Sequence, residues 1–408
     1  MYPCGFLGTE MPYSPFPYNI TWPEGYQPVY ISHLGRHGSR YMTSGKDLDT
    51  LIQWLTEATV KKQITYFGKC LLNDLLSLSL LSQKKWGQLT PLGDKEQFYL
   101  AVRMYKRFPQ IFNKKVFADS TYIKRAVQSM KCFTAGLYSC DNTITVEQQI
   151  NKKADPILRF FDLNLQYLSY KKKGAWKSEQ ENFVNRCNIG RLFLSQFVSD
   201  ISSLPLPCTT LASMIYNANC NCYNVFEASA MQHFFSRREM RYFWQNENCK
   251  NYLEKGPSGI GTNLPQDIAF GLLQNIITQT ETALGTSTIG ANFRFAHAET
   301  IIPFAALIGI NHYGLQTDNL FAIPYFWRDS TVAPMATNIQ FVFFQGLNKP
   351  TLVRVLYNEK DAFLPLPPQY PCFYKWTDVK AYFEQILSAL PIPTQYDTIV
   401  QQVKYFKL

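Results

Sequence analysis

Two short stretches of the sequence combine histidine with strongly charged side chains. The first is Gly35-Arg36-His37-Gly38-Ser39-Arg40, and the second is His297-Ala298-Glu299-Thr300. Guanidinium groups bind phosphate oxygens through paired hydrogen bonds. A histidine between two of them is placed either to attack phosphorus or to carry a proton, and a second histidine with a carboxylate supplies one more ligand and a general acid. These residue types together indicate phosphate-ester chemistry.

Each stretch has a simpler interpretation when it is taken alone. A basic pentapeptide is more often a solvated turn than a site. His297 fits a buried histidine at a helix start, with Glu299 complementing the helix dipole. Arg125, at the start of a predicted helix after residues 116–119, suits a phosphate site, although most arginines at helix starts face solvent. The chemistry therefore depends on whether the fold brings these residues together.

All three candidates follow a segment with the pattern of a short β-strand, and helical periodicity comes after each one. The predicted strands are residues 29–34, 116–119 and 292–296, and the predicted helices are residues 48–55, 126–137 and 299–310. Strand–turn–helix units in the first and last thirds of the chain predict an α/β fold with one sheet built from both ends. In such sheets the site lies at the carboxyl ends of the strands.

The remaining pattern predicts three parts. Residues 1–140 form the first part of an α/β core after an irregular arm at 1–27, residues 141–265 form a mainly helical insertion, and residues 266–408 complete the core. Thr90-Pro91 is a helix start with proline at the first position. Further predicted elements are a helix at residues 268–276 and strands at residues 339–344 and 351–357.

Composition narrows the class of protein. The chain has 408 residues, of which 46% are hydrophobic, 15% aromatic and 17% charged, so intrinsic disorder is excluded. The longest apolar run, residues 301–310, is interrupted by Pro303 and is too short to span a bilayer. A formal charge of +10 favours anionic partners. Charge alone leaves nucleic acid, a membrane surface and a small polyanion open.

In this order along the chain, Arg36-His37-Gly38-Ser39-Arg40, Arg125 and His297-Ala298-Glu299 resemble the branch 2 histidine phosphatases, the superfamily of histidine acid phosphatases and phytases. The sequence His-Ala-Glu-Thr is similar to that of the multiple inositol polyphosphate phosphatase subgroup. The resemblance covers residues 28 to 385 and is weakest in the helical middle. Met42 stands where the family often has proline, which shapes the turn rather than the chemistry. Further matching stretches are residues 87–93, 292–310 and 355–360.

The resemblance implies an α/β sandwich core with an inserted, mainly helical cap domain. It implies that His37 is the nucleophile and forms a phosphohistidine, and that Glu299 protonates the leaving alcohol and then activates water. It implies no metal and no cofactor, and a substrate among the inositol polyphosphates, such as phytate. The residues implied to hold the phosphate are Arg36, Arg40, Arg125 and His297.

Physical reasoning adds two expectations to this resemblance. A protonated His297 and a protonated Glu299 would both favour an acidic pH optimum. Lys46 and Lys255 are candidate contacts for phosphates that do not react, and their alternative is a surface position. We expect a small polyanionic substrate, no nucleic acid, no membrane and a monomer.

Other functions compete with this hypothesis. The nearest is a broad-specificity histidine acid phosphatase that acts on small monoesters with the same residues. An inactive anion-binding module is a second alternative, but the presence of both His37 and Glu299 argues against it. Nucleic-acid binding through residues 237–255 is a third, although Glu239, Glu247 and Glu254 dilute its positive charge.

The compartment is expected mainly from the resemblance, because the family is usually extracytoplasmic or lumenal. We therefore expect a secreted, periplasmic or lumenal enzyme, and residues 1–10, which carry no basic segment followed by an apolar one, fit a chain whose signal peptide has been removed. Ten cysteines, an even number, favour at least one disulfide, while ten reduced thiols remain the alternative. The sequon at Asn19 decides nothing.

Overall fold

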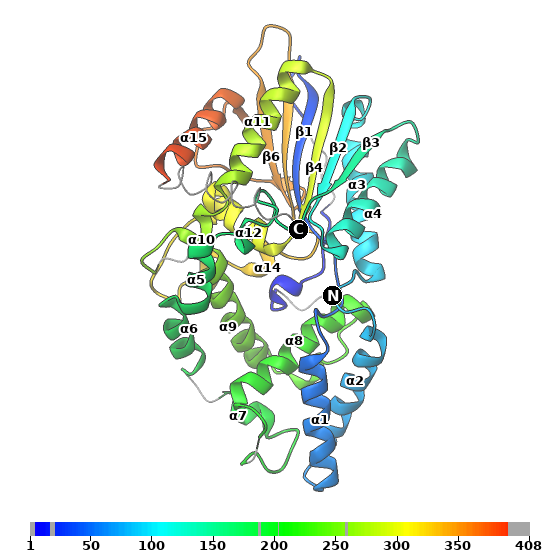
Figure 1. Ribbon diagram of the computed structural model, residues 1–408, viewed down its shortest axis with the longest axis vertical. Helices are drawn as coiled ribbons and strands as arrows, with labels where there is room; N and C mark the ends of the chain where they lie inside the picture. The colour runs from blue at the N-terminus through cyan, green and yellow to red at the C-terminus, as the bar shows by residue number, and fades with distance from the viewer. Residues whose placement is uncertain (1–4, 17–20, 187–188, 203, 258–259, 391–408) are drawn as a thin grey trace.

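The structure is a computed structural model that describes residues 5–16, 21–186, 189–202, 204–257 and 260–390 (Figure 1). The sequon at Asn19, as well as Cys4 and Cys187, lies outside these residues. Within the described part of the chain, none of the helices combines the length and the apolar character needed to cross a membrane.

One mixed β-sheet forms the upper body in Figure 1. Its strand order is β3-β2-β4-β1-β5-β6-β7, and β8 pairs with β6. The strands β3, β2, β4 and β1 are parallel, whereas β5 and the strands beyond it are antiparallel to their neighbours. The bounds are β1 Gln27–Arg36, β2 Lys115–Ser120, β3 Val146–Ile150, β4 Ile289–Ala296, β5 Asn338–Gln345, β6 Leu352–Tyr357, β7 Lys360–Asp361 and β8 Phe373–Lys375. Because β1 and β4 are neighbours, the prediction of one sheet built from both ends of the chain is confirmed.

Helices cover both faces of this sheet (Figure 1). The helices α3 (Pro91–Arg107) and α4 (Lys124–Cys140) pack on one face, and α11 (Phe270–Thr286), α12 (Ala298–Leu307) and α15 (Trp376–Ala389) pack on the other. The strand β5 shows how the sequence produces two cores. Its alternate residues Phe341 and Phe343 belong to the core under α12 and α15, whereas Val342 and Phe344 belong to the core under α3 and α4. A strand buried on both faces needs an unbroken apolar run, as this one has.

A helical body lies below the sheet in Figure 1. Its apolar core joins α1, α2, α7, α8 and α9 through residues such as Leu51, Leu75, Phe193, Leu211 and Phe243. These side chains recur at helical spacing and leave the polar residues outside. The helix bounds are α1 Lys46–Val60, α2 Tyr66–Ser82, α5 Leu165–Lys173, α6 Trp176–Val184, α7 Ile189–Leu194, α8 Cys208–Phe226, α9 Arg237–Lys255, α10 Leu264–Asp267, α13 Ile323–Phe326 and α14 Asp329–Val332.

Two elements cross the predicted part boundaries. The strand β3 lies inside residues 141–265, yet it pairs in parallel with β2. Four of its five residues are exposed, so it lacks the apolar alternation by which strands are found in a sequence. The helices α1 and α2 come from residues 1–140 and pack on α8 in the helical body. The three-part division stays a prediction, and these two contacts show that elements on either side of its first boundary pack with the other part.

The described cysteines are not joined by disulfides. These eight cysteines therefore give no support to the prediction of at least one disulfide, which stays a prediction for the whole chain. An even count says nothing about whether two Cα atoms lie within the distance of about 7 Å that a disulfide requires. The free thiols are Cys70, Cys132, Cys140, Cys208, Cys220, Cys222, Cys249 and Cys372.

The N-terminal arm lies between the sheet and the helical body. Apart from the short turn η1 (Gly8–Glu10), residues 5–16 have no helix or strand, as predicted for an irregular arm. The turn η1 contacts α8, α9 and α14. Tyr13 fixes the arm to the sheet, because its hydroxyl donates a 2.8 Å hydrogen bond to the buried carboxylate of Glu359. The arm therefore reaches the edge of the sheet where the parallel strands end.

Candidate active site

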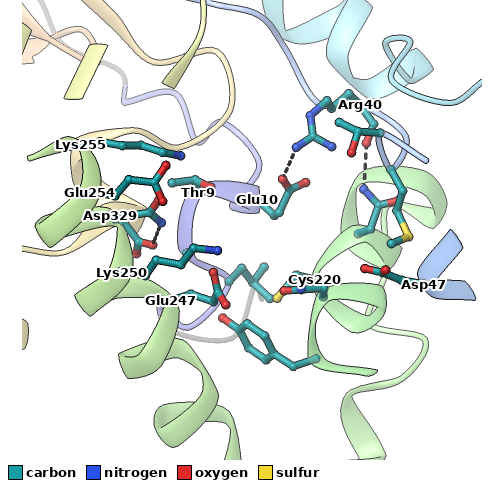
Figure 2. A pocket seen from close by; sticks show the side chains of 18 of the residues that line it. Thr9, Glu10, Arg40, Asp47, Cys220, Glu247, Lys250, Glu254, Lys255 and Asp329 are labelled. Atoms are coloured by element: carbon teal, nitrogen blue, oxygen red, sulfur yellow. Dashed lines mark hydrogen bonds and ion pairs between the residues drawn. The ribbon is translucent and has the colours of Figure 1, made fainter. Parts of the chain in front are cut away.

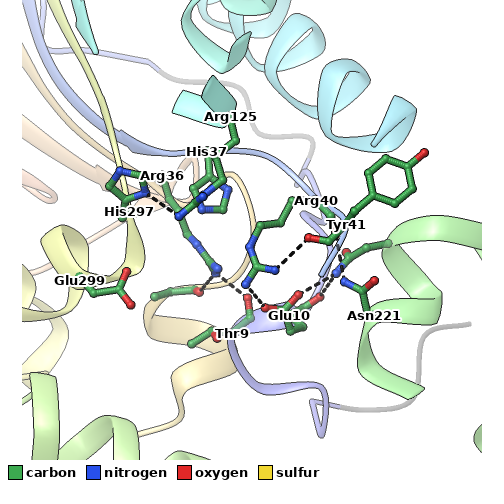
Figure 3. A network of polar contacts seen from close by, with 12 residues as sticks. Thr9, Glu10, Arg36, His37, Arg40, Tyr41, Arg125, Asn221, His297 and Glu299 are labelled. Atoms are coloured by element: carbon green, nitrogen blue, oxygen red, sulfur yellow. Dashed lines mark hydrogen bonds and ion pairs between the residues drawn. The ribbon is translucent and has the colours of Figure 1, made fainter. Parts of the chain in front are cut away.

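The carboxyl ends of three parallel strands bring the predicted residues together. In the sheet register Arg36 of β1 faces Ala296 of β4, so His37 and His297 leave neighbouring strands at the same edge. Their ring centroids are 5.5 Å apart. Arg125 comes to the same place from the first turn of α4, which follows β2 (Figure 3).

His37 has a defined tautomer. Its Nδ1 lies 2.9 Å from the backbone oxygen of Gly38, which can only accept a hydrogen bond, so Nδ1 carries the proton and Nε2 keeps its electron pair. Burial, and then the positive charges of Arg125 and Arg36, hold the pKa of His37 well below its usual 6.5. The ring is therefore neutral, which is the form that attacks an electrophile.

His297 lies among hydrogen-bond donors. Thr121 Oγ1 and Arg159 Nη1 lie 2.9 and 3.3 Å from its Nε2, and Arg125 Nη2 lies 3.5 Å from its Nδ1. Burial, and then the charge of Arg125, hold the pKa of His297 well below 6.5. The expectation that a protonated His297 adds positive charge is therefore wrong for the substrate-free protein, because burial and the adjacent guanidinium groups both disfavour the imidazolium.

Four arginines around the two histidines share one feature. Within the described chain, the Nε of Arg36, Arg40, Arg125 and Arg159 is buried and has no hydrogen-bond partner. Burial lowers the pKa of Arg36 and of Arg125 to about 10, so both stay charged at neutral and acidic pH. A buried donor without a partner costs free energy. An anion that accepts hydrogen bonds from these groups would remove that cost.

The turn that carries His37 packs backbone to backbone against the start of α3. A Cβ on Gly38 would lie 2.5 Å from the backbone oxygen of Gly93, and a Cβ on Gly93 would lie 2.1 Å from that of Ser39. Neither position accepts a side chain. Thr90 caps α3 by accepting a 3.2 Å hydrogen bond from the Gly93 amide, which confirms the predicted helix start.

A buried carboxylate also fixes the turn that carries His37. Glu96 of α3 accepts hydrogen bonds from the Ser39 amide at 2.6 Å, the Ser39 hydroxyl at 2.8 Å and the Tyr13 amide at 2.8 Å. Burial raises the pKa of Glu96 to about 7. The next residue, Gln97, donates a 2.9 Å hydrogen bond to the backbone oxygen of Arg36. These contacts fix the backbone on both sides of His37.

Glu299, the predicted proton donor, is paired with a lysine. Lys255 is the last residue of α9, and its Nζ lies 3.0 Å from Glu299 Oε1 in the first turn of α12. Burial acts to raise the pKa of Glu299, but the positive charge and the hydrogen bond of Lys255 act to lower it, and the pKa lies well below 4.5. Glu299 is therefore ionised in the substrate-free protein, and Lys255 reaches the site as its partner.

A cavity of about 410 Å³ adjoins these groups between the N-terminal arm and the helical body (Figure 2). His37 and His297 do not line its wall, whereas Arg40 and Lys255 do, so it is the space beside the reacting groups. The predicted contact Lys46 is exposed at the start of α1 and is not on this wall. The charged lining residues are Glu10, Arg40, Asp47, Lys171, Glu247, Lys250, Glu254, Lys255 and Asp329.

Three residues at the site are absent from the sequence prediction: Glu10, Glu96 and Arg159. Glu10 Oε1 pairs with Arg40 Nη2 at 2.6 Å, and Arg159 contacts His297. Both stand in irregular segments with no pattern to single them out. Glu96 could have been found from the sequence, because it lies on the same buried face of α3 as Leu100, and a buried carboxylate needs hydrogen-bonding partners.

A neutral histidine beside fixed guanidinium groups suits phosphoryl transfer, in which charge stabilisation and positioning do most of the work. Fold and site together thus define an α/β phosphoryl-transfer enzyme that acts through histidine. The sequence profile of the histidine phosphatase superfamily (branch 2) matches residues 31–358. The chain belongs to this family.

Two curated relatives are similar over most of their length. Both are named multiple inositol polyphosphate phosphatase 1: the Gallus gallus protein is 24% identical over 394 residues, covering 90% of this chain and 83% of the relative, and the Homo sapiens protein is 23% identical over 404 residues, covering 89% and 80%.

Solved structures share the fold. The Bifidobacterium longum multiple inositol polyphosphate phosphatase in complex with inositol hexasulfate superposes with a TM-score of 0.81 at 20% identity, over 92% of this chain and 97% of that one. The phytase from D. castellii gives a TM-score of 0.72 at 16% identity, over 94% and 85%. The predicted α/β histidine-phosphatase fold is confirmed.

Proposed function

We propose that this chain hydrolyses inositol polyphosphates, inositol hexakisphosphate (phytate) among them, as a metal-independent phosphomonoesterase. The observation that carries the proposal is a neutral His37 with a free Nε2 beside arginines whose Nε groups are buried and unpartnered. Such guanidinium groups provide the charge stabilisation that metal ions provide in many other phosphoryl-transfer enzymes. The names of the similar proteins support the substrate class.

In the first step His37 Nε2 attacks the phosphorus atom, and the bond from phosphorus to the inositol oxygen breaks. Glu299 gives its proton to that oxygen and becomes a carboxylate, so the alcohol leaves neutral. The phosphoryl group stays on His37 as a phosphohistidine. Arg36, Arg40 and Arg125 hold its oxygens, with neutral His297 beside them.

In the second step water attacks the phosphohistidine from the side that the alcohol has left. The Glu299 carboxylate takes a proton from this water, and the bond between nitrogen and phosphorus breaks. Inorganic phosphate leaves and His37 returns to its neutral form. Glu299 is therefore an acid in the first step and a base in the second, so its protonation state must change once in each turnover.

The cavity beside the site has room for the phosphates that do not react. Its lysines Lys171, Lys250 and Lys255 come from the helical part of the chain, and Arg40 also lines it. Lys46 is not on this wall, so we place the non-reacting phosphates near Lys255 instead. The net charge of +10 favours the approach of a polyanion.

The second candidate is a broad-specificity histidine acid phosphatase. The mixed charge of the cavity wall favours it, because a wall built only for polyanions would carry few carboxylates, whereas this wall carries five: Glu10, Asp47, Glu247, Glu254 and Asp329. Rates with inositol hexakisphosphate and with p-nitrophenyl phosphate separate the two candidates. A much higher kcat/KM for the inositol substrate supports the main proposal.

Phosphate release from inositol hexakisphosphate, with and without EDTA, tests the function. We expect release that EDTA does not change and that falls at least about a thousandfold in His37→Ala, because the nucleophile is lost. The matched control is His233→Ala, which removes an exposed histidine on another part of the surface and should keep full activity. Absence of release from the native chain between pH 3 and pH 8 would reject the proposed substrate.

We further propose a secreted, periplasmic or lumenal setting and a monomeric enzyme that binds neither nucleic acid nor membranes. The acidic residues of α9, which is the segment considered for nucleic-acid binding, argue against that function. Glu239 caps the start of α9 and Glu254 pairs with Lys171, so α9 has structural uses for its charges.

A further inference from the structure

We propose that Lys255 couples recognition of a polyphosphate to the protonation of Glu299. Lys255 is held on Glu299 in the substrate-free protein. A phosphate next to the reacting one draws Lys255 away, and Glu299 then takes up the proton that it later gives to the leaving alcohol. The inference rests on the proposed function, and it makes Lys255 a specificity-determining residue that distinguishes polyphosphates from monophosphates.

The pair joins the ends of two helices from different parts of the chain. Lys255 is the last residue of α9, and Glu299 lies in the first turn of α12. The dipole at a helix C-terminus favours a cation and that at an N-terminus favours an anion, so both charges are stabilised without substrate. The side chains of Lys255 and Glu299 are 15% and 31% exposed, respectively. A ligand in the cleft can therefore reach both.

The same arrangement occurs at two other cations of the cavity. Arg40 pairs with Glu10 at 2.6 Å, and Lys171 pairs with Glu254 at 3.2 Å. In the substrate-free chain these cations, like Lys255, are each held by a carboxylate. A ligand with several phosphates offers them alternative anions, whereas a ligand with one phosphate offers only the group that reacts. Of the three pairs, only the one with Lys255 includes the proton donor.

The charged and titratable groups around Glu299 come from several elements. Lys255 is the strongest influence that lowers its pKa, and it opposes burial, which raises it. Removing Lys255 and adding phosphate charge both act in the direction of protonation. Other groups coupled to Glu299 are Arg36, Arg125 and Tyr167. The elements packed on α12 further carry, among others, Asp162, Glu247, Lys250, Glu254, Asp267, Glu281, His312 and Asp329.

A lysine side chain suits this exchange. Its ammonium group sits on a flexible four-carbon stem, so Nζ can move from the carboxylate to a nearby phosphate oxygen while α9 stays in place. Lys255 also lines the cavity that we assign to the non-reacting phosphates. With inositol 1-phosphate no such phosphate is present, and Lys255 remains on Glu299.

The test compares two substrates with the same kind of leaving group. Inositol hexakisphosphate and inositol 1-phosphate both release a secondary alcohol of inositol, which requires a proton donor, and they differ only in the neighbouring phosphates. The profile of kcat against pH is measured for both substrates with the native enzyme and with Lys255→Met. Because activity needs protonated Glu299, the basic limb of each profile reports the pKa of Glu299 in that complex.

In the native enzyme we expect the basic limb for inositol 1-phosphate to lie about one to three pH units below that for inositol hexakisphosphate, the usual effect of one adjacent opposite charge. In Lys255→Met the limb for inositol 1-phosphate moves up and the gap closes. Lys255→Arg keeps a cation and should keep the gap. The matched control Lys250→Met removes another lysine of α9 on the same wall, and it should also keep the gap.

Coincident limbs in the native enzyme would overturn the inference, and so would a gap that survives Lys255→Met or closes in Lys250→Met. A binding measurement separates this failure from failure of the proposed function. Inositol hexasulfate does not titrate in this range, so protons taken up on its binding, measured by calorimetry in two buffers, belong to the protein. Near pH 5 the native enzyme should take up a fraction of a proton on binding inositol hexasulfate. This uptake should be smaller in Glu299→Gln and in Lys255→Met, whether or not phytate is hydrolysed. Equal uptake in all three proteins refutes the exchange.

Discussion

His33 lies on β1, four residues before the proposed nucleophile His37, and it should make the protein sensitive to acid. Its side chain is 1% exposed, and in the described part of the structure both ring nitrogens lack a hydrogen-bond partner. The rings of Phe133, Phe293 and Phe295 surround it at centroid distances of 5.5, 5.5 and 5.7 Å. Burial, and then the charge of Arg294, lower the pKa of His33 from 6.5 to about 3.

The sign of the effect follows from which state binds the proton. Between pH 6.5 and pH 3 the unfolded chain has a protonated His33 and the folded protein does not, so the free energy of unfolding falls as the pH falls. At pH 4.5 the loss relative to pH 8 is about 2 to 3 kcal/mol, since each pH unit between the two pKa values costs about 1.4 kcal/mol. That loss is a large part of the stability of an ordinary domain.

The assay is urea unfolding at pH 8 and at pH 4.5, followed by tryptophan fluorescence. His33→Leu and His33→Gln both remove the titrating group, one with an apolar and one with a polar side chain. Either variant can lose stability through packing, but both should lose about 2 to 3 kcal/mol less than the native protein between the two pH values. His37 and His297 titrate equally in all three proteins, so they cancel in the comparison. The same pH dependence in native protein and both variants would refute a buried, neutral His33.

Two further predictions concern the arginines. Arg159→Met should lower kcat/KM for inositol hexakisphosphate about ten- to a hundredfold, because a hydrogen bond to a charged group contributes roughly 1.5 to 3 kcal/mol; unchanged kinetics would restrict Arg159 to its ion pair with Asp162. Glu10→Gln keeps an oxygen for Arg40 and removes a negative charge beside the phosphate site, so inorganic phosphate should inhibit the variant at severalfold lower concentration. Weaker inhibition would mean that Glu10 mainly positions Arg40.

The predicted site residues were found because they stand in short stretches that follow strands. Arg36, His37 and Arg40 occupy one turn, and His297 and Glu299 occupy another. Parallel strands end at one edge of a sheet, so a strand pattern followed by reactive residues is enough to bring such turns together. The pairing of β1 with β4 confirms that reasoning for the two histidines. The exposed strand β3 shows its limit, because an edge strand with polar residues carries no pattern.

The protonation states and ion pairs of the site residues could be assigned only from the tertiary structure. The sequence alone led us to expect that a protonated His297 would favour an acidic pH optimum, and that Lys255 either contacts a non-reacting phosphate or lies at the surface. In the folded protein burial and Arg125 keep His297 neutral, and Lys255 lies on Glu299, 44 residues away in the chain. A pKa depends on burial and on charges within a few ångströms, and neither is a property of local sequence.

The sequence by itself determined the two reactive turns, the α/β sheet that presents them, the helix start at Thr90 and the family to which they belong. The tertiary structure decided which other side chains meet those turns. Arg159 approaches His297 across 138 residues and Glu10 approaches Arg40 across 30, both from segments without periodicity. Local patterns follow from backbone geometry and the burial of apolar residues along one element. Contacts between distant irregular segments follow only from how the completed elements pack.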